Sequence, residues 1–241
     1  MKTIEYLYSD VGVLYGDQGH FLFFDQLFAG HKIVRTGLAD EPAFVRGSVD
    51  LLYLGGMTER HQRDVITRLM PFRDVLSARI EAGMHVLLTC NAMDIVGRQI
   101  VFPDGIVAGL GLFDFSVDWT PWPRINQFVY GMWQDIALTG HKSQFTKTTF
   151  GPGMEGRHFF SADRGMGANP ADSREGIQYK HVYATQCMGP FFVINPPLMK
   201  HILRELELPD KLPAEAFAEA AYEKRAAQFA DPKTRQAMEV I

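Results

Sequence analysis

Cys90 is the residue of this chain that offers the clearest chemistry. It directly follows the apolar run 86–89 (Val-Leu-Leu-Thr), and small or helix-compatible residues, Asn91-Ala92-Met93, come after it. A strand that ends at a cysteine before a helix is typical of a nucleophile elbow, in which a sharp turn presents the thiol at the carboxyl end of a sheet. We expect the N-terminus of the next helix to favour the thiolate and an oxyanion formed beside it.

The elements that would position Cys90 alternate along the chain between strands and helices, which predicts an α/β fold. We expect an open, mostly parallel sheet with helices on both faces and further helices at the C-terminus. Cys90 then lies at the sheet edge where ligands bind in such folds. The predicted strands are 4–8, 33–35, 50–54, a central 85–89, and 181–185; the predicted helices are 21–28 with a C-cap at Gly30, 59–82 broken near Pro71, 197–206 and 214–229.

Other segments are less regular. Residues 102–129 predict shorter, antiparallel strands, and residues 151–176 predict a long glycine-rich loop. We expect one main domain over residues 1–208, with a C-terminal helical extension, 209–241, packed on it. Asp17 and Glu175 fall in expected loops and are interpreted as solvated. Phe21, Phe24, Leu27 and Phe28 recur at helical spacing and predict a core stripe.

Composition excludes several classes of protein. The chain has 241 residues, 46% of them hydrophobic, which suffices for a full core. The net charge of −4, without a basic block, predicts no nucleic-acid or anionic-membrane partner. Two cysteines are too few for a disulfide framework, and no run of about 18 apolar residues exists to insert into a membrane. We expect a cytoplasmic protein, since no signal-peptide core follows Met1.

Seven short motifs, in order along the chain, resemble the cobyric-acid-synthase-like (CobB/CobQ-like) branch of the class I glutamine amidotransferases. Within that branch they are most similar to the GatD family, the glutaminase subunits of lipid II isoglutaminyl synthase. The matching segments are YGDQGH (15–20), LGG (54–56), TCNAMDIVG (89–97), GLGLFD (109–114), RINQ (124–127), GMGAN with EG (165–169 and 175–176), and TQCMGP with NP (185–190 and 195–196).

The resemblance implies a flavodoxin-like class I fold and glutaminase chemistry. Cys90 would attack the side-chain amide of glutamine, a histidine would relay protons, and the ammonia would pass to a Mur-ligase-like synthetase in a heterodimer, for amidation of a cell-wall precursor. The double glycine Gly55-Gly56 and Asn91 would supply the oxyanion hole or glutamine contacts, and Arg124 would hold glutamine or brace the site. The resemblance implies no metal and no other cofactor on this chain, because the partner ligase would carry the nucleotide.

The chain departs from the family pattern where the chemistry should be. The family histidine corresponds to Met188, and methionine cannot transfer a proton at neutral pH. Asn91 replaces an elbow glycine, Leu88 replaces a small residue, and 140–144 corresponds poorly to a family string. Without a base, Cys90 would keep an ordinary thiol pKa near 8.5. These departures predict partial or complete loss of glutaminase activity.

Simpler interpretations apply to other candidate residues. His61, His141, His158 and His181 could each replace the missing base, although no spacing favours one and a structural role suits all four. Cys187 is expected to face away from Cys90, because alternate residues of a strand face opposite sides. Residues 151–156 match a GxGxxG pattern, but no strand precedes them and no helix follows, so a dinucleotide site is not indicated.

Three functional hypotheses remain open from the sequence. The chain is an ammonia-supplying glutaminase with an unrecognised base, a catalytically degenerate pseudo-glutaminase that acts as a binding or regulatory subunit, or a hydrolase-like or isomerase-like enzyme that has reused Cys90. A lone cysteine at a strand end can also be simply a packed apolar residue.

Overall fold

A six-stranded sheet forms the centre of the computed structural model, which describes residues 1–235. Its strand order is β13-β14-β4-β3-β1-β2, and every neighbouring pair is parallel except β13 with β14. The mostly parallel sheet and the central place of β4 confirm the sequence prediction. The strands are β1 (Thr3–Tyr6), β2 (Lys32–Arg35), β3 (Leu51–Leu54), β4 (His85–Thr89), β13 (Ile177–Tyr179) and β14 (Val182–Thr185).

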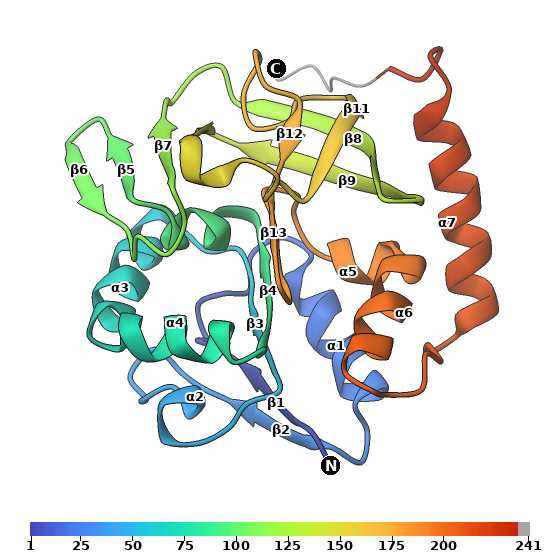
Figure 1. Ribbon diagram of the computed structural model, residues 1–241. Coiled ribbons are helices and arrows are strands. Elements are labelled where there is room, and N and C mark those ends of the chain that lie inside the picture. The colour runs from blue at the N-terminus through green and yellow to red at the C-terminus, as the bar shows by residue number, and fades with distance from the viewer. Residues whose placement is uncertain (236–241) are drawn as a thin grey trace.

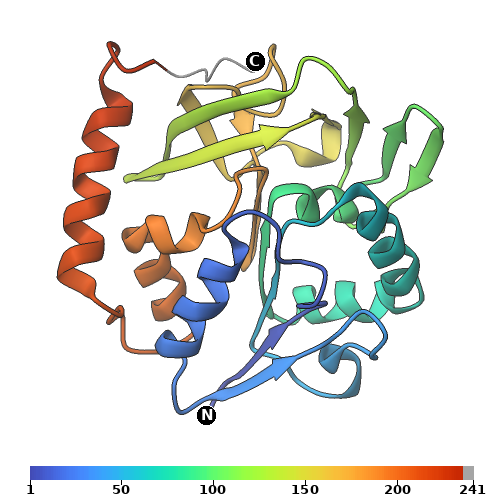
Figure 2. The ribbon, with the colours of Figure 1, turned by 180° about the vertical axis from the view of Figure 1, so that it is seen from behind.

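Helices cover both faces of this sheet, as predicted. One face carries α1, α5 and α6, and the other carries α2, α3 and α4 (Figures 1 and 2). The predicted long helix broken near Pro71 is α3 and α4 joined by a short 3-10 turn, η1. The bounds are α1 (Asp17–Leu27), α2 (Ala43–Arg46), α3 (Glu59–Leu69), η1 (Met70–Phe72), α4 (Arg73–Glu81), α5 (Phe191–Ile194) and α6 (Pro196–Glu205).

Side chains of the central strands alternate between two cores. In β4, Val86 and Leu88 pack in the core beneath α3 and α4, whereas Leu87 packs in the core beneath α1 and α6. The second core contains Phe21, Phe24 and Phe28, which confirms the predicted stripe of α1. The alternation also places His85 and Thr89 on the α1 and α6 side, because they are two residues from Leu87.

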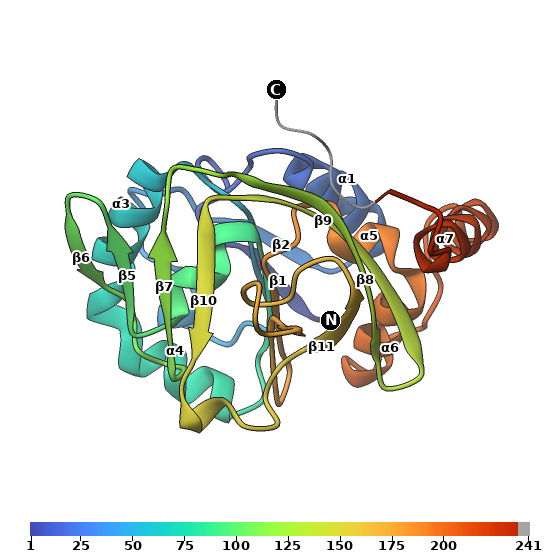
Figure 3. The same ribbon diagram turned by 90° about the horizontal axis from the view of Figure 1, so that it is seen from above.

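Two smaller sheets lie above the carboxyl ends of the central strands (Figures 1 and 3). Their orders are β10-β7-β5-β6 and β12-β11-β8-β9. Most pairs are antiparallel, but β5 and β7 run parallel, which corrects the expectation of antiparallel strands alone. The strands are β5 (Gln99–Phe102), β6 (Gly105–Ala108), β7 (Phe115–Trp119), β8 (Ile125–Trp133), β9 (Ile136–Gln144), β10 (Thr146–Phe150), β11 (Phe160–Arg164) and β12 (Arg174–Glu175).

The expected glycine-rich loop over residues 151–176 is therefore wrong in part. It contains a 3-10 turn, η3 (Pro152–Met154), and two strands, β11 and β12. Phe160 of β11 is buried, and the strand pairs with β8, so partners far away in the sequence override the local glycine content.

The last helix, α7 (Glu215–Ala230), packs beside β8, β9, α5 and α6. Tyr222 donates a hydrogen bond to the carbonyl of Ala137 at 2.8 Å, and Lys200 of α6 pairs with Glu215 at 2.7 Å. The division at residue 208 stays a prediction, and the end of the proposed extension, 236–241, lies outside the described residues. Within residues 1–235, no helix has the length and apolarity needed to cross a membrane.

Candidate active site around Cys90

Cys90 lies at the carboxyl end of β4 in a left-handed backbone conformation, with φ of 56°. A left-handed non-glycine residue costs about 1–2 kcal/mol, so the turn is strained as a nucleophile elbow requires. The next segment, η2 (Cys90–Val96), is a 3-10 helix of seven residues rather than the expected α-helix.

The surroundings of Cys90 favour the thiol over the thiolate. The side chain is buried, and burial together with the nearby Asp17 carboxylate raises the pKa of Cys90 far above its usual range, although the backbone amide of Asn91 opposes this. The expectation that the following helix activates the thiol, or that its pKa stays ordinary, is therefore wrong. Desolvation of the sulfur outweighs the dipole of a short 3-10 turn.

A cavity of about 260 Å³ opens beside the thiol. Its walls come from the segment before α1, the start of α3, and the β9–β10 corner. The ionisable side chains among the lining residues are Tyr15, Glu59, Cys90 and Arg124, and within residues 1–235 no histidine lines it. The remaining lining residues are Leu14, Met57, Thr58, Gln62, Asn91, Trp119, Ser143, Gln144, Phe145 and Thr146.

Arg124 lines this cavity. Its guanidinium donates to the Tyr15 hydroxyl at 3.1 Å and lies 5.1 Å from the centroid of the Phe145 ring. Both contacts fix a cation where the carboxylate of an amino-acid ligand could pair with it. The structure thus brings Arg124 and Cys90 to one cavity, as the sequence prediction requires.

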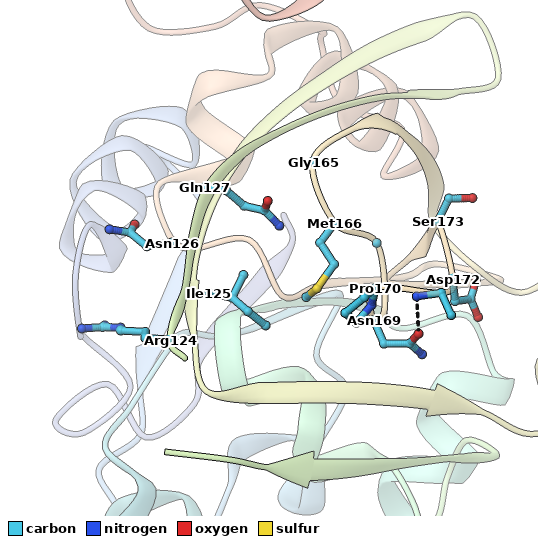
Figure 4. Close-up of a pocket in the computed structure, with 12 residues that line it drawn as sticks. Arg124, Ile125, Asn126, Gln127, Gly165, Met166, Asn169, Pro170, Asp172 and Ser173 are labelled. Carbon is cyan, nitrogen blue, oxygen red and sulfur yellow. Dashed lines mark hydrogen bonds between the residues drawn. The ribbon is translucent and has the colours of Figure 1, made fainter. Parts of the chain in front are cut away.

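Arg124 also borders a second, larger cavity of about 700 Å³ between β8 and the loop 165–173. Figure 4 shows Ile125 and Gln127 pointing towards Met166 of that loop, whereas Arg124 points away from it. Arg124 thus lies between the space beside Cys90 and the larger opening, since it lines both cavities.

The double glycine packs against Asp17. A Cβ on Gly55 would lie 2.8 Å from Cγ of Asp17, and a Cβ on Gly56 would lie 3.0 Å from Cβ of Cys90. The Gly56 amide donates to Oδ2 of Asp17 at 2.8 Å, so it is directed to this carboxylate instead of an open oxyanion position. The role of Gly55 and Gly56 in binding stays a prediction.

Asp17 is the centre of a buried polar network. Oδ1 accepts from the Tyr53 hydroxyl at 2.6 Å and from Oγ1 of Thr89 at 2.8 Å. The His20 ring joins through Tyr53 at 2.6 Å, and its Nε2 accepts from the Phe192 amide at 3.0 Å. Burial lowers the pKa of His20, which favours a neutral ring. The interpretation of Asp17 as a solvated loop residue is wrong, because this side chain is fully buried.

Asn91 and Gln62 form a second polar group under the cavity. Asn91 accepts from the Met57 amide at 2.9 Å and donates to the Met57 carbonyl at 2.7 Å, while Gln62 donates to the Asn91 carbonyl at 2.7 Å. Gln62 and Gln186 also donate to Asp94, and burial raises the pKa of Asp94 to about 7. The Asn91 side chain thus tethers the elbow to the β3–α3 loop.

Met188 is next to the elbow but offers no base. The Cys187 carbonyl accepts from the Cys90 amide at 3.1 Å, and the Met188 amide donates to the His141 carbonyl at 2.8 Å. His141 packs on the Phe128 ring, and burial and Arg124 lower its pKa. None of the four candidate histidines, His61, His141, His158 and His181, lines the Cys90 cavity among the described residues.

Behind the cavity wall, Lys142 and Glu175 form a fully buried ion pair. Lys142 also donates to the Gly167 carbonyl at 2.6 Å, and Glu175 accepts from Thr185 and from the Gln186 amide, both at 2.8 Å. Glu175 is therefore not the solvated loop residue that the sequence suggested. The pair joins β9 to β12, and the hydrogen bonds from Thr185 and Gln186 connect Glu175 to the segment that leads to Met188.

Sequence reasoning missed Gln62 and His20 as parts of the site. Both were visible as polar residues on apolar helix faces: Gln62 precedes Val65, Ile66 and Leu69 at helical spacing, and His20 is four residues before Phe24. A polar residue inside such a stripe must find buried partners, which was the signal available.

The parallel sheet, the elbow cysteine at its carboxyl edge and the cavity lined by Arg124 define a class I glutamine amidotransferase architecture. The CobB/CobQ-like glutamine amidotransferase domain matches residues 27–194, and the chain belongs to this family. It is 25% identical to "Lipid II isoglutaminyl synthase (glutamine-hydrolyzing) subunit GatD" of Staphylococcus aureus (strain N315), over 84% of this chain and 83% of that protein.

A second relative of the same description, from Streptococcus pneumoniae (strain ATCC BAA-255 / R6), is 23% identical over 97% of this chain and 92% of its own length. Solved structures support the fold. A glutamine amidotransferase crystal structure aligns with a TM-score of 0.57 at 15% identity, covering 85% of this chain and 99% of that one. Another, from Thermotoga maritima, aligns with a TM-score of 0.51 at 10% identity, covering 94% and 92%.

Proposed function

We propose that this chain is a GatD-like subunit of a two-subunit amidotransferase that keeps the glutamine pocket but has lost most of its glutaminase activity. The observation that carries the proposal is the environment of Cys90: an elbow beside a cavity with Arg124, and Met188 where the resemblance expects a histidine. The pocket can hold an amino acid, whereas the attack of Cys90 on an amide lacks the histidine that would assist it.

The electrostatic environment of Cys90 also supports the loss of glutaminase activity. A buried thiol beside the Asp17 carboxylate resists deprotonation, because that carboxylate disfavours a second negative charge. A histidine at position 188 would have supplied a proton acceptor and, once protonated, a compensating positive charge. Without it, no histidine lines the described part of the cavity, and the pKa of Cys90 stays raised by burial and Asp17.

The proposed partner is a Mur-ligase-like synthetase, and the proposed acceptor is a cell-wall precursor. The acceptor follows from the relatives, which are described as subunits of lipid II isoglutaminyl synthase, whereas the kind of partner follows from the motif resemblance. In this assignment the chain is a binding or regulatory subunit, and we place it in the cytoplasm, where the thiols Cys90 and Cys187 stay free. Co-purification with such a synthetase from the native cell tests the pairing.

A working glutaminase is the second candidate, because the strained φ of 56° at Cys90 persists in this structure. A strained elbow without chemistry offers no compensation for its cost. In this case the base would be a lining group such as Glu59 or a group from the partner subunit, and ammonia would pass from the cavity to the synthetase.

The test is ammonia release from glutamine by the wild type, Cys90→Ala, Met188→His and a volume-matched control, Met188→Leu. We expect little activity in the wild type and in Met188→Leu. Met188→His should gain about 10²–10⁴-fold, the range of general acid–base catalysis, and this gain should vanish in Met188→His/Cys90→Ala.

Two outcomes would contradict the proposal. Wild-type activity that Cys90→Ala abolishes would reject degeneracy and establish the glutaminase. If Met188→His stays silent and calorimetry detects no glutamine binding to the wild type, the cavity is not a glutamine pocket and the proposal fails.

A further inference from the structure

A cluster of imidazole and carboxylate groups lies at the opposite end of β4 from Cys90. His85 begins β4, His181 directly precedes β14, and Glu205 ends α6. Because β4 and β14 are adjacent and in parallel register, with Val86 opposite Val182, the two histidines lie side by side. The five residues from His85 to Cys90 span about 16 Å of strand, so this cluster is separate from the cysteine site.

The donor atoms of the cluster lie close together. Nε2 of His85 lies 3.6 Å from Oε2 of Glu205, and Nδ1 of His181 lies 3.3 Å from the same oxygen. All three ligand atoms lie within 4.8 Å of one another. Tetrahedral Zn²⁺ with bonds of about 2.0–2.1 Å separates its ligand atoms by about 3.3 Å, close to these two spacings and longer than a good hydrogen bond.

Two of these nitrogens lack a hydrogen-bond partner. Nε2 of His85 and Nδ1 of His181 are buried atoms without one, and His85 as a whole is only 5% exposed. Buried polar atoms normally have hydrogen-bond partners, and here each nitrogen faces the Glu205 carboxylate at an ion-pair distance, which leaves room for an ion between the three groups. A metal ion bound to both imidazoles would satisfy both atoms at once.

His201 and Tyr183 complete the surroundings of Glu205. Nε2 of His201 lies 3.3 Å from Oε1 of Glu205, one helical turn away, and the Tyr183 hydroxyl donates to Oε2 at 2.8 Å. The hydroxyl would orient the carboxylate as an outer-shell partner, and His201 could supply a fourth ligand. The cluster thus contains the imidazole and carboxylate donors that suit Zn²⁺.

We propose that His85, His181 and Glu205 bind one divalent transition-metal ion, with Zn²⁺ the best match, and that the ion fastens α6 to the amino-terminal edge of the central sheet. The two imidazoles are stacked at 4.2 Å with 21° between their planes, so the lone pairs run side by side. Because stacked rings direct their lone pairs in parallel, binding one ion to both would require the His181 ring, whose side chain is 35% exposed, to turn about its Cβ–Cγ bond.

The experiment is titration of chelator-treated full-length protein with Zn²⁺ against a competing chromophoric chelator. The variants are His181→Asn and Glu205→Gln, at partly exposed positions that tolerate polar replacements, with His61→Asn on α3 as the matched control. We expect one Zn²⁺ per chain, and affinity weakened at least about 100-fold in both variants, because loss of an outer-shell partner alone costs about 10–100-fold. Binding should raise the melting temperature of the wild type but not of His181→Asn.

Cys90→Ala separates this site from a thiolate site. It should bind Zn²⁺ as the wild type does, and Co²⁺ in the wild type should give a visible spectrum without a sulfur charge-transfer band. The inference is overturned if the wild type binds no better than His181→Asn, or if Cys90→Ala abolishes binding. Neither result depends on whether the protein hydrolyses glutamine.

Discussion

The buried carboxylate of Asp17 should be among the largest single contributors to the stability of this fold. Replacing Asp17 by Ala leaves three buried donors without their acceptor: the Tyr53 hydroxyl, Oγ1 of Thr89 and the Gly56 amide. An orphaned buried donor costs about 1–3 kcal/mol. We therefore expect Asp17→Ala to lower the free energy of unfolding by at least about 3 kcal/mol.

Urea unfolding, followed by the fluorescence of the three tryptophans, measures this loss. The matched control is Asp25→Ala on the same helix. Asp25 accepts from Arg35 and from the hydroxyl of the buried Tyr6, and its side chain is 39% exposed, so its loss orphans one buried donor instead of three and should cost about 1 kcal/mol. Comparable losses in the two variants would refute the argument from burial.

A double-mutant cycle sharpens the test. Thr89→Val removes one of the three donors and should cost about 1 kcal/mol on its own. In Asp17→Ala/Thr89→Val that donor is no longer orphaned, so the double variant should lose less than the sum of the single losses, by about 1 kcal/mol. Strict additivity would mean that Thr89 and Asp17 do not interact.

Three further predictions concern buried ionisable groups. Burial raises the pKa of Asp94 to about 7, whereas the unfolded chain loses this proton near pH 3.8. The folded state therefore binds one more proton than the unfolded state between these values, and the free energy of unfolding falls as the pH rises from about 4 to 7. Urea unfolding should show Asp94→Asn gaining stability relative to the wild type between pH 4 and pH 8, and a pH-independent difference would contradict this. Lys142→Met should lower the free energy of unfolding, measured by calorimetry, by about 3–5 kcal/mol, because it leaves Glu175 buried and unpaired. Lys142→Met/Glu175→Gln should recover part of this loss. No recovery would mean that the unpaired charge of Glu175 is not the cause. At pH 8, iodoacetamide should alkylate Cys90 at least tenfold more slowly in the native protein than in urea, since each unit of raised pKa is tenfold less thiolate. Equally fast labelling, read by mass spectrometry, would show that the thiol is activated.

The periodicity of the sequence was enough to predict five of the six strands of the central sheet, whereas β13 was missed. The apolar strands 51–54 and 85–89, and helices punctuated by Pro71 and Gly83, carry their signal locally, because buried parallel strands and covering helices each have a characteristic residue spacing. The position of Cys90 at a sheet edge followed from the same pattern. The strands β11 and β12 did not, because their pairing partners are distant and their own residues resemble a loop.

The sequence by itself thus determined the family, the fold class and Met188 in place of a histidine. Only the tertiary structure decided what surrounds the cysteine. The burial of Asp17 and Glu175, the direction of the Gly56 amide, and the meeting of His85, His181 and Glu205 depend on segments far apart in the chain. A pKa or a binding site is set by the distances between such groups, and a sequence fixes those distances only through the complete packing of the fold.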